Sequence, residues 1–206
     1  MIQYFKIDYH RCMFKGSIAQ IVKLPWDRMN PVDLAFLSTV TGREFADSLR
    51  AGAEHYKNDG KILQMISEEL QTDNLVYRDY SKKGDHVDML LHFFDELKLW
   101  SKVSESVKEA GIEYVKGMSA LSGEEKMMCI ISREKELPVI FTKIVDSHNW
   151  KDFGLGFYEK YLRDHIVWDG EEGGHADLVG HIDVDQKVLD SFWKLRLKMY
   201  EAVPLS

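Results

Sequence analysis

Hydrophobic residues recur along most of the chain at the three- and four-residue spacing of an amphipathic α-helix. Ile62, Met65 and Ile66 keep this spacing in one segment, and Met89 and Phe93 keep it in another. No segment alternates between apolar and polar residues in the way that a half-buried strand requires. We therefore predict an all-α fold, a compact bundle of about seven helices.

Caps and breakers set the predicted helix boundaries. Asn30 and Pro31 are typical of a helix start, whereas Asn58, Asp59 and Gly60 together form a stop signal. The polar stretch at 72–84 predicts a loop between two helices. The predicted helices cover residues 31–56, 61–71, 85–99, 104–116, 122–145, 150–169 and 184–202.

Length and composition favour one domain. The chain has 206 residues, of which 45% are hydrophobic, and no repeat, low-complexity tract or linker divides it. We expect a single helical domain over residues 1–206. The net charge is −7 and the basic residues do not cluster, so neither a nucleic acid nor an anionic membrane surface is an expected partner.

The chain is predicted to be cytoplasmic. Its first residues lack the continuous apolar segment of a secretory signal, and no run of about 18 apolar residues is present to span a bilayer. The two cysteines, Cys12 and Cys129, lie far apart in sequence. This spacing argues against a disulfide scaffold and against a zinc ribbon.

A carboxylate interrupts one of the apolar helix stripes. Met127, Ile130 and Phe141 belong to the stripe, and Glu134 falls in its middle. Burying an unpaired carboxylate is costly unless a cation, a network of donors or a metal compensates for it. Pro138 follows four residues later and removes one backbone hydrogen bond from the helix. Taken alone, a salt bridge is the simpler explanation for Glu134.

Histidines and acids interrupt the last long apolar segment in the same way. His165 and Asp169 are four residues apart, so both project from one helix face and can reach one ion. His175 follows a Gly-rich break, after which Asp177 and His181 form another pair at the same spacing. We predict that the first three are metal ligands, and we keep the pair Asp177 and His181 as an alternative set.

Earlier in the chain, Glu68 and Glu69 end one predicted helix and His86 begins the next on its buried side. Glu68 and His86 complete the predicted ligand set, which is Glu68, His86, Glu134, His165, Asp169 and His175. A mixed set of oxygen and nitrogen ligands suits iron or manganese and is poor for structural zinc. Facing helices of a bundle commonly hold two-metal carboxylate sites built from Glu and His.

Four segments that carry these residues resemble, in order and composition, the metal-binding segments of the heme-oxygenase-like di-iron oxidases and oxygenases. They read ISEEL, GDHVDML, ISREKELPVIF and YLRDHIVWDGEEGGHADL, and the resemblance spans roughly residues 55 to 185. In that family, the segments supply an EE pair, a histidine, a glutamate and an H-x3-D-x2-H pattern. Carried over, these positions fall on the six residues of the predicted ligand set.

The resemblance leaves two of these positions open. The gap between the EE pair and the histidine is longer here than in the family, so Glu69 or Asp79 is an alternative to Glu68. The last histidine is displaced, and Glu172 stands at its usual position. Glu172 is therefore an alternative to His175.

The resemblance implies an oxygen-activating enzyme with the heme oxygenase-like fold. It implies a pair of iron ions, or one iron and one manganese, with dioxygen as co-substrate. The expected partners are a small organic substrate and an external electron donor, with a possible homodimer as the assembly. The reaction type does not follow from the fold. Arg133, next to Glu134, is a candidate anchor for a substrate carboxylate, although a surface salt bridge is the simpler expectation.

Two other functions compete with this one. Metal-free relatives of the same bundle, the thiaminase-like and cofactor-independent oxidase proteins, would leave Cys129 as a candidate nucleophile. A non-catalytic helical binding or regulatory protein would instead present the bundle surface to a partner. Metal content separates the three, because neither alternative needs three histidines and three acids at these positions.

Overall fold

Helices make up all the regular structure in the part of the chain that the structure describes. The computed structural model describes residues 16–70, 86–170 and 175–206, apart from the side chains of residues 168–170 and 176. Within these ranges no strand is present, and one isolated β-bridge joins Met29 to Leu205. The predicted all-α fold is confirmed. None of the helices in these ranges has the length and apolar character needed to cross a membrane.

Nine α-helices and three short 3-10 helices are present in the described ranges. The α-helices are α1 Gly16–Val22, α2 Pro31–His55, α3 Gly60–Glu69, α4 His86–Glu96, α5 Glu105–Ser119, α6 Gly123–Val145, α7 Gly156–Gly170, α8 His175–Leu178 and α9 Gln186–Glu201. The 3-10 helices are η1 Trp26–Arg28, η2 Trp100–Lys102 and η3 Trp150–Phe153.

Most of the predicted helices agree with these bounds, but the segment predicted as one helix over 150–169 is divided. Its first turn is η3, and the backbone then passes through Gly154, whose φ of 71° is left-handed. A left-handed glycine ends a helix, so α7 begins afresh at Gly156. The short helices α1 and α8 were not predicted, because each has too few residues to show a helical period.

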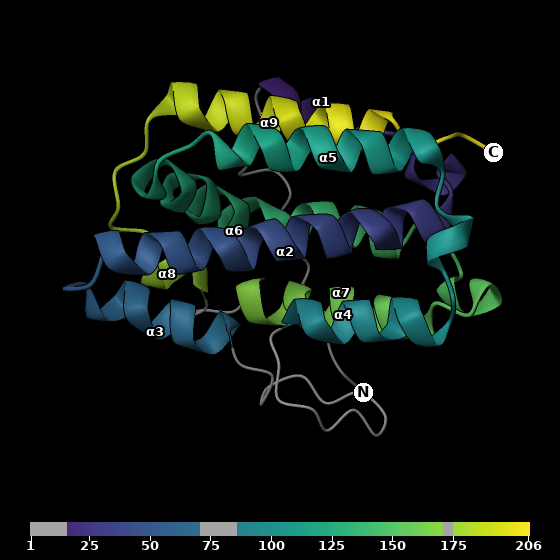
Figure 1. Ribbon diagram of the computed structural model, residues 1–206, viewed down its shortest axis with the longest axis horizontal. Helices are drawn as coiled ribbons and strands as arrows, with labels where there is room; N and C mark the ends of the chain where they lie inside the picture. Colours follow the sequence, from purple (N-terminus) through teal and green to yellow (C-terminus); the bar gives the residue numbers. More distant parts are fainter. Residues whose placement is uncertain (1–15, 71–85, 171–174) are drawn as a thin grey trace.

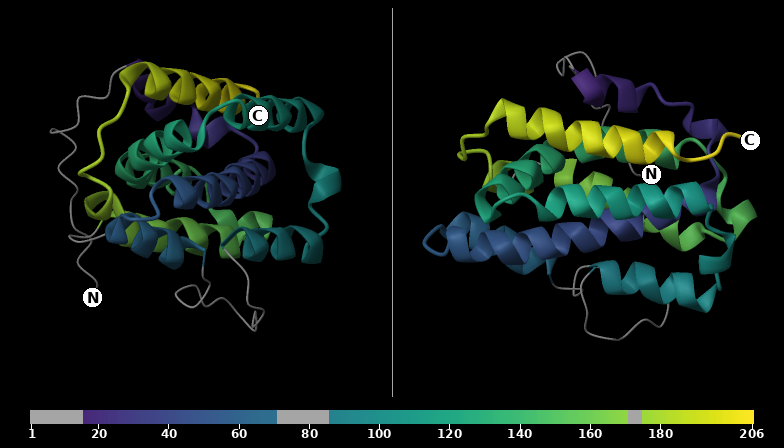
Figure 2. Two further views of the ribbon diagram at one scale, coloured as in Figure 1. Left: turned by 60° about the vertical axis from the view of Figure 1, so that its left-hand side comes forward. Right: turned by 45° about the horizontal axis from the view of Figure 1, so that its top comes forward.

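The helices form three layers (Figures 1 and 2). The two longest, α2 and α6, cross the middle of the molecule and pack against each other. On one side of them lie α1, α5 and α9, and on the other side lie α3, α4, α7 and α8. Residues from the second outer layer therefore face α6 across a common interior, although they come from four separate segments of the chain.

Local capping fixes where several of these helices begin. The Asn30 side chain accepts hydrogen bonds from the backbone N–H groups of Val32 and Asp33 at the start of α2. Asp59 caps α3 in the same way, and Ser122 with Glu125 forms a capping box at the start of α6. Each cap satisfies backbone donors that have no partner inside the helix.

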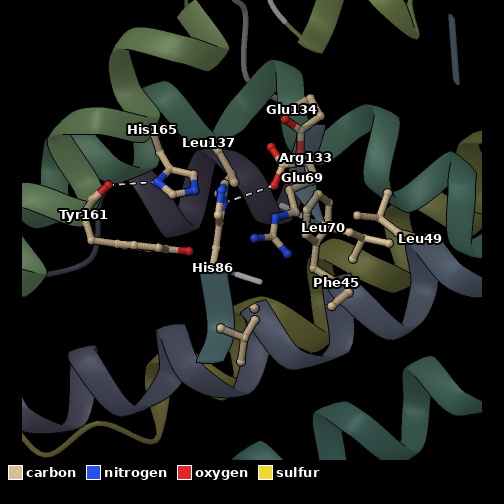
Figure 3. A pocket seen from close by; sticks show the side chains of 13 residues that line it. Phe45, Leu49, Glu69, Leu70, His86, Arg133, Glu134, Leu137, Tyr161 and His165 are labelled. Atoms are coloured by element: carbon tan, nitrogen blue, oxygen red, sulfur yellow. Dashed lines mark hydrogen bonds and ion pairs between the residues drawn. The ribbon is translucent and has the colours of Figure 1, made fainter. Parts of the chain in front are cut away.

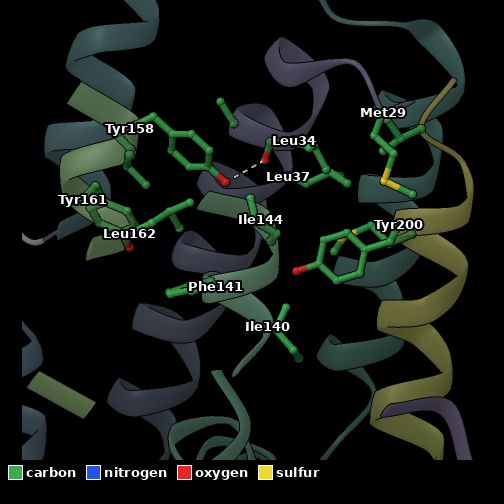
Figure 4. Packing of buried hydrophobic residues seen from close by; sticks show 14 of the residues in the cluster. Met29, Leu34, Leu37, Ile140, Phe141, Ile144, Tyr158, Tyr161, Leu162 and Tyr200 are labelled. Carbon is green, nitrogen blue, oxygen red and sulfur yellow. Dashed lines mark hydrogen bonds between the residues drawn. The ribbon is translucent and has the colours of Figure 1, made fainter. Parts of the chain in front are cut away.

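Two apolar clusters fill the interior. The main cluster includes Leu34, Phe93, Phe141 and Trp150, and Figure 4 shows the part of it that lies around α6 and α7. The second, which we call the α3 cluster, consists of Phe45, Leu49, Ile62, Met65, Ile66, Met127, Ile130, Ile131 and Val179. The two clusters together enclose the buried polar residues of α3, α4, α6, α7 and α8.

A buried aspartate connects the starts of α2 and α5. Asp33 is fully buried, and its carboxylate accepts hydrogen bonds from the backbone N–H of Ser104 at 2.8 Å and from its hydroxyl at 2.6 Å. We predict that Asp33→Ala lowers the free energy of unfolding by about 1–3 kcal/mol, because both Ser104 donors lose their acceptor. The measurement is urea denaturation.

The matched control is Asp47→Ala on the same helix. Asp47 is exposed and forms a surface ion pair with Arg50, so its loss is expected to cost less than about 0.5 kcal/mol. Equal midpoints for Asp33→Ala and the unaltered protein would contradict the role given to Asp33.

Candidate metal centre

Five buried side chains from five helices meet where the two apolar clusters adjoin. They come from the last residue of α3, the first residue of α4, the middle of α6, the third turn of α7 and the first residue of α8. In that order they are Glu69, His86, Glu134, His165 and His175. Each exposes 6% or less of its surface, so none of these polar groups is solvated like a surface residue.

Glu69 belongs to two groups of potential ligands at once. It forms one group with His86 and His165 and another with Glu134 and His175, and within each group the ligand atoms lie within 4.8 Å of one another. Glu69 is the residue that the two groups share. A carboxylate has two oxygens and can serve two ions, whereas each imidazole offers one nitrogen to one ion.

In the first group, His165 is held in the form that binds metal. Its Nδ1 donates to the backbone carbonyl of Tyr161 at 2.8 Å, because a carbonyl oxygen can only accept (Figure 3). Burial and the neighbouring His86 lower the pKa of His165 to about 3, so the imidazole is neutral at physiological pH. The ligating lone pair is therefore on Nε2, and such a backbone contact is the usual way that proteins orient a metal-binding histidine.

The rings of His86 and His165 lie edge to face, with centroids 5.1 Å apart. His86 also approaches the shared carboxylate, with 3.5 Å between its Nδ1 and Oε2 of Glu69. Figure 3 shows His86 between His165 and Glu69, with a dashed line from His86 to Glu69.

In the second group, carboxylates surround His175. Its Nδ1 lies 2.7 Å from Oε1 of Glu69 and 3.6 Å from Oε2 of Glu134, and its Nε2 lies 3.3 Å from Oε2 of Glu68. One imidazole thus faces three acids. Such a concentration of acids in an interior needs positive charge to be stable.

The two central carboxylates differ in their titration. Burial raises the pKa of Glu69, but a hydrogen bond from His175 and the positive charges of His86 and His175 outweigh burial and lower it well below its usual range. Burial raises the pKa of Glu134, and the charge of Glu69 raises it further against the hydrogen bond from His175. Glu69 is therefore the more firmly ionised of the two.

The structure brings four of the six predicted ligands into these groups, and it has Glu69 in place of a fifth, Glu68. His86, Glu134, His165 and His175 lie where the sequence analysis expected ligands. Glu68 does not belong to either group: its side chain is 44% exposed, accepts a hydrogen bond from Gln64 and meets the ligand cluster at Nε2 of His175. Glu69, one of the two alternatives to Glu68, takes the shared position instead.

The helical period of α3 carries the signal that would have found this position. Ile62, Met65 and Ile66 are buried, and Glu69 follows at the next position of the same stripe, seven residues after the first. Glu68 is one residue off the stripe and therefore faces outward.

The remaining candidates are not part of the described cluster. The side chain of Asp169 lies outside the described residues, as do Asp79 and Glu172 in full. Asp177 is exposed. His181 follows α8 in the chain. Its Nε2 lies 2.7 Å from the carboxylate of Asp59, the residue that caps the start of α3.

Four of the five ligands, all except His175, border a partly enclosed cavity of about 10 Å³, which is room for about one water molecule. Its polar lining comes from Glu69, Glu134, His86, His165 and Arg133. Its apolar lining comes from Phe45, Ala46, Leu49, Leu70, Val87 and Leu137. The surface salt bridge expected for Arg133 is therefore wrong, since this side chain is buried beside the centre.

Comparison with known proteins finds no match for this chain. No protein-family model, no curated protein and no solved structure matches the chain. Any function assigned to the chain therefore rests on the geometry and chemistry of its own residues.

The donor set fits a pair of iron or manganese ions. The two groups offer two carboxylates and three imidazoles, and no thiolate is among them. Mixed oxygen and nitrogen donors of this kind suit those metals, whereas structural zinc sites are usually built from four ligands that include cysteines.

The shared carboxylate leads to a prediction about metal content. Glu69→Ala is expected to reduce the bound iron or manganese from two ions per chain to nearly none, because both groups lose a ligand. His165→Ala and Glu134→Ala are each expected to leave about one ion, because each belongs to one group. The measurement is elemental analysis after anaerobic loading with ferrous iron.

Glu68→Gln is the control for Glu69→Ala. It alters the adjacent residue on the same helix, which lies outside both groups, and is expected to keep about two ions. Loss of metal in Glu68→Gln together with full occupancy in Glu69→Ala would reverse the assignment of the shared ligand.

Proposed function

We propose that the protein is an oxidoreductase whose pair of metal ions, two irons or one iron and one manganese, activates dioxygen to oxidise a small organic substrate. The observation that carries this proposal is a buried carboxylate, Glu69, shared by two groups of ligands that each include histidine. When bound, the ions would supply redox electrons and open coordination positions for dioxygen.

The protein's own residues would contribute three things to this chemistry. Glu69 would hold the two ions near each other through one carboxylate. The bond from His165 to the Tyr161 carbonyl keeps a neutral nitrogen donor oriented before metal binds. The apolar lining of the cavity excludes bulk water and so limits side reactions of reactive oxygen species.

The resemblance to the heme-oxygenase-like di-iron enzymes supports the same function. Three of its four segments carry His86, Glu134, His165 and His175 at the expected positions. The remaining segment, ISEEL, carries the shared ligand Glu69 next to Glu68, the ligand that the resemblance implied. An external electron donor would be needed to return the ions to the reduced state. We propose it as a partner together with the substrate.

The competing metal-free enzyme receives little support from Cys129. This thiol is 1% exposed and belongs to the main apolar cluster. Burial, together with the charges of Glu44 and Glu125, raises its pKa to about 12. At physiological pH it is a neutral, inaccessible thiol, whereas a nucleophilic cysteine needs to form the thiolate.

Oxygen consumption tests the proposal. The protein loaded anaerobically with two ferrous ions is expected to consume dioxygen on mixing and to show a transient visible absorbance band. His165→Ala is expected to reduce the oxygen consumed in the first turnover at least tenfold, because one ion is lost. His92→Ala is the control, since His92 is 42% exposed on the outer face of α4.

Failure of the metal-loaded protein to consume dioxygen faster than ferrous iron free in buffer would contradict the proposed function. So would equal consumption by His165→Ala and the unaltered protein.

The state of Cys129 gives an independent prediction about the competing enzyme. In a Cys12→Ser variant, a thiol reagent at pH 8 is expected to leave Cys129 unmodified until denaturant unfolds the chain, because the thiol is buried and protonated. The measurement is the reagent's absorbance with and without denaturant. Rapid reaction in the native protein would restore Cys129 as a candidate nucleophile.

A further inference from the structure

Arg133 is a buried cation on the wall of the metal cavity. It lies on α6 directly before Glu134 and is 4% exposed. Its guanidinium packs over the ring of Phe45, 4.0 Å from the ring centroid, and its Nη1 donates to the backbone carbonyl of Thr41 at 3.0 Å. These contacts fix the plane of the guanidinium, which also lines the cavity shared with Glu69 and the histidines (Figure 3).

The other edge of this guanidinium has donors without acceptors. Nε is buried and makes no hydrogen bond, and among the residues that the structure describes no acceptor pairs with Nη2. In the same ranges no carboxylate forms an ion pair with Arg133, although Glu134 is its neighbour in sequence. The paired N–H groups of Nε and Nη2 are the fork that binds a carboxylate through two parallel hydrogen bonds.

The net charge at the centre also favours an anionic ligand. Two divalent ions and Arg133 would bring five positive charges, against three negative charges from Glu68, Glu69 and Glu134. Ionised Asp169 would not remove the excess, because it adds one negative charge. A buried site with excess positive charge favours an anionic ligand.

We infer that Arg133 anchors the carboxylate group of the substrate at the edge of the metal cavity. Phe45, Leu49, Leu70 and Leu137 line the same cavity and would contact carbon rather than polar atoms. The substrate class is therefore a small carboxylic acid, whose carbon atoms would face these apolar side chains. This substrate class rests on the proposed function, whereas the anion site itself requires only Arg133 and the cavity.

Formate is the probe, because it is the smallest carboxylate and therefore needs the least room in this small cavity. Formamide, its neutral analogue of nearly equal size, is the ligand control. Binding is measured by isothermal titration calorimetry in two samples of each protein, one free of metal and one loaded with manganese(II), with the metal content of each sample determined.

Arg133→Gln is expected to weaken formate binding by about ten- to hundredfold, since a bidentate charged contact is lost, and to keep about two ions per chain. Formamide is expected to bind weakly to all variants. Arg163→Gln is the matched control, because Arg163 is a partly exposed arginine of α7 that pairs with Glu159, and it is expected to bind formate as the unaltered protein does. Arg133→Lys keeps the charge without the planar fork and is expected to fall in between.

The outcomes separate the two proposals. Equal formate affinity in Arg133→Gln and the unaltered protein, at full metal content, would overturn the carboxylate anchor and leave the metal centre intact. If the unaltered chain takes up no metal, the proposed function fails. The titration of the metal-free proteins then tests the anion site alone. Weaker formate binding in Arg133→Gln than in the unaltered protein supports that site, and equal binding refutes it. If Arg133→Gln does not fold, the same comparison is made with Arg133→Lys.

Discussion

The burial of ionised carboxylate at the centre of the helical bundle is the constraint on which the rest of the structure depends. Glu69 and Glu134 come from different helices and are both almost inaccessible to water. Three imidazoles surround them, yet one of these, His165, is held neutral and cannot balance their charge. Buried acids persist where a cation stabilises them. Two metal ions between these side chains would supply that charge.

The layered arrangement explains how four distant segments reach one point. α2 and α6 cross the middle of the molecule. On one side of them α3 and α4 pack against α2, and α7 and α8 pack against α6, so the ends of the short helices can face the centre of α6. The ligand groups follow the division of the interior. His86 and His165 are one helical turn from Leu90 and Leu162 of the main cluster, whereas Glu134 and His175 are one turn from Ile130 and Val179 of the α3 cluster. Glu69 lies between them.

Much of this arrangement could be predicted from the sequence, because the helical period determines which side of a helix faces inward. The period placed Glu134 in an apolar stripe, and the same rule applied to α3 would have chosen Glu69 over Glu68. Two features lay beyond such reasoning. The turn at Gly154 depends on a single left-handed glycine, which a periodic pattern does not reveal. Nor does the pattern show that Arg133, one residue before Glu134, also turns inward and packs over Phe45.

The central claim is that two ions share one carboxylate, and anomalous diffraction from crystals loaded with iron or manganese tests it most directly. We predict two metal peaks on either side of Glu69, one beside His86 and His165 and the other beside Glu134 and His175. A single peak, two peaks that do not both contact Glu69, or metal bound elsewhere while these five side chains keep their present contacts would contradict it.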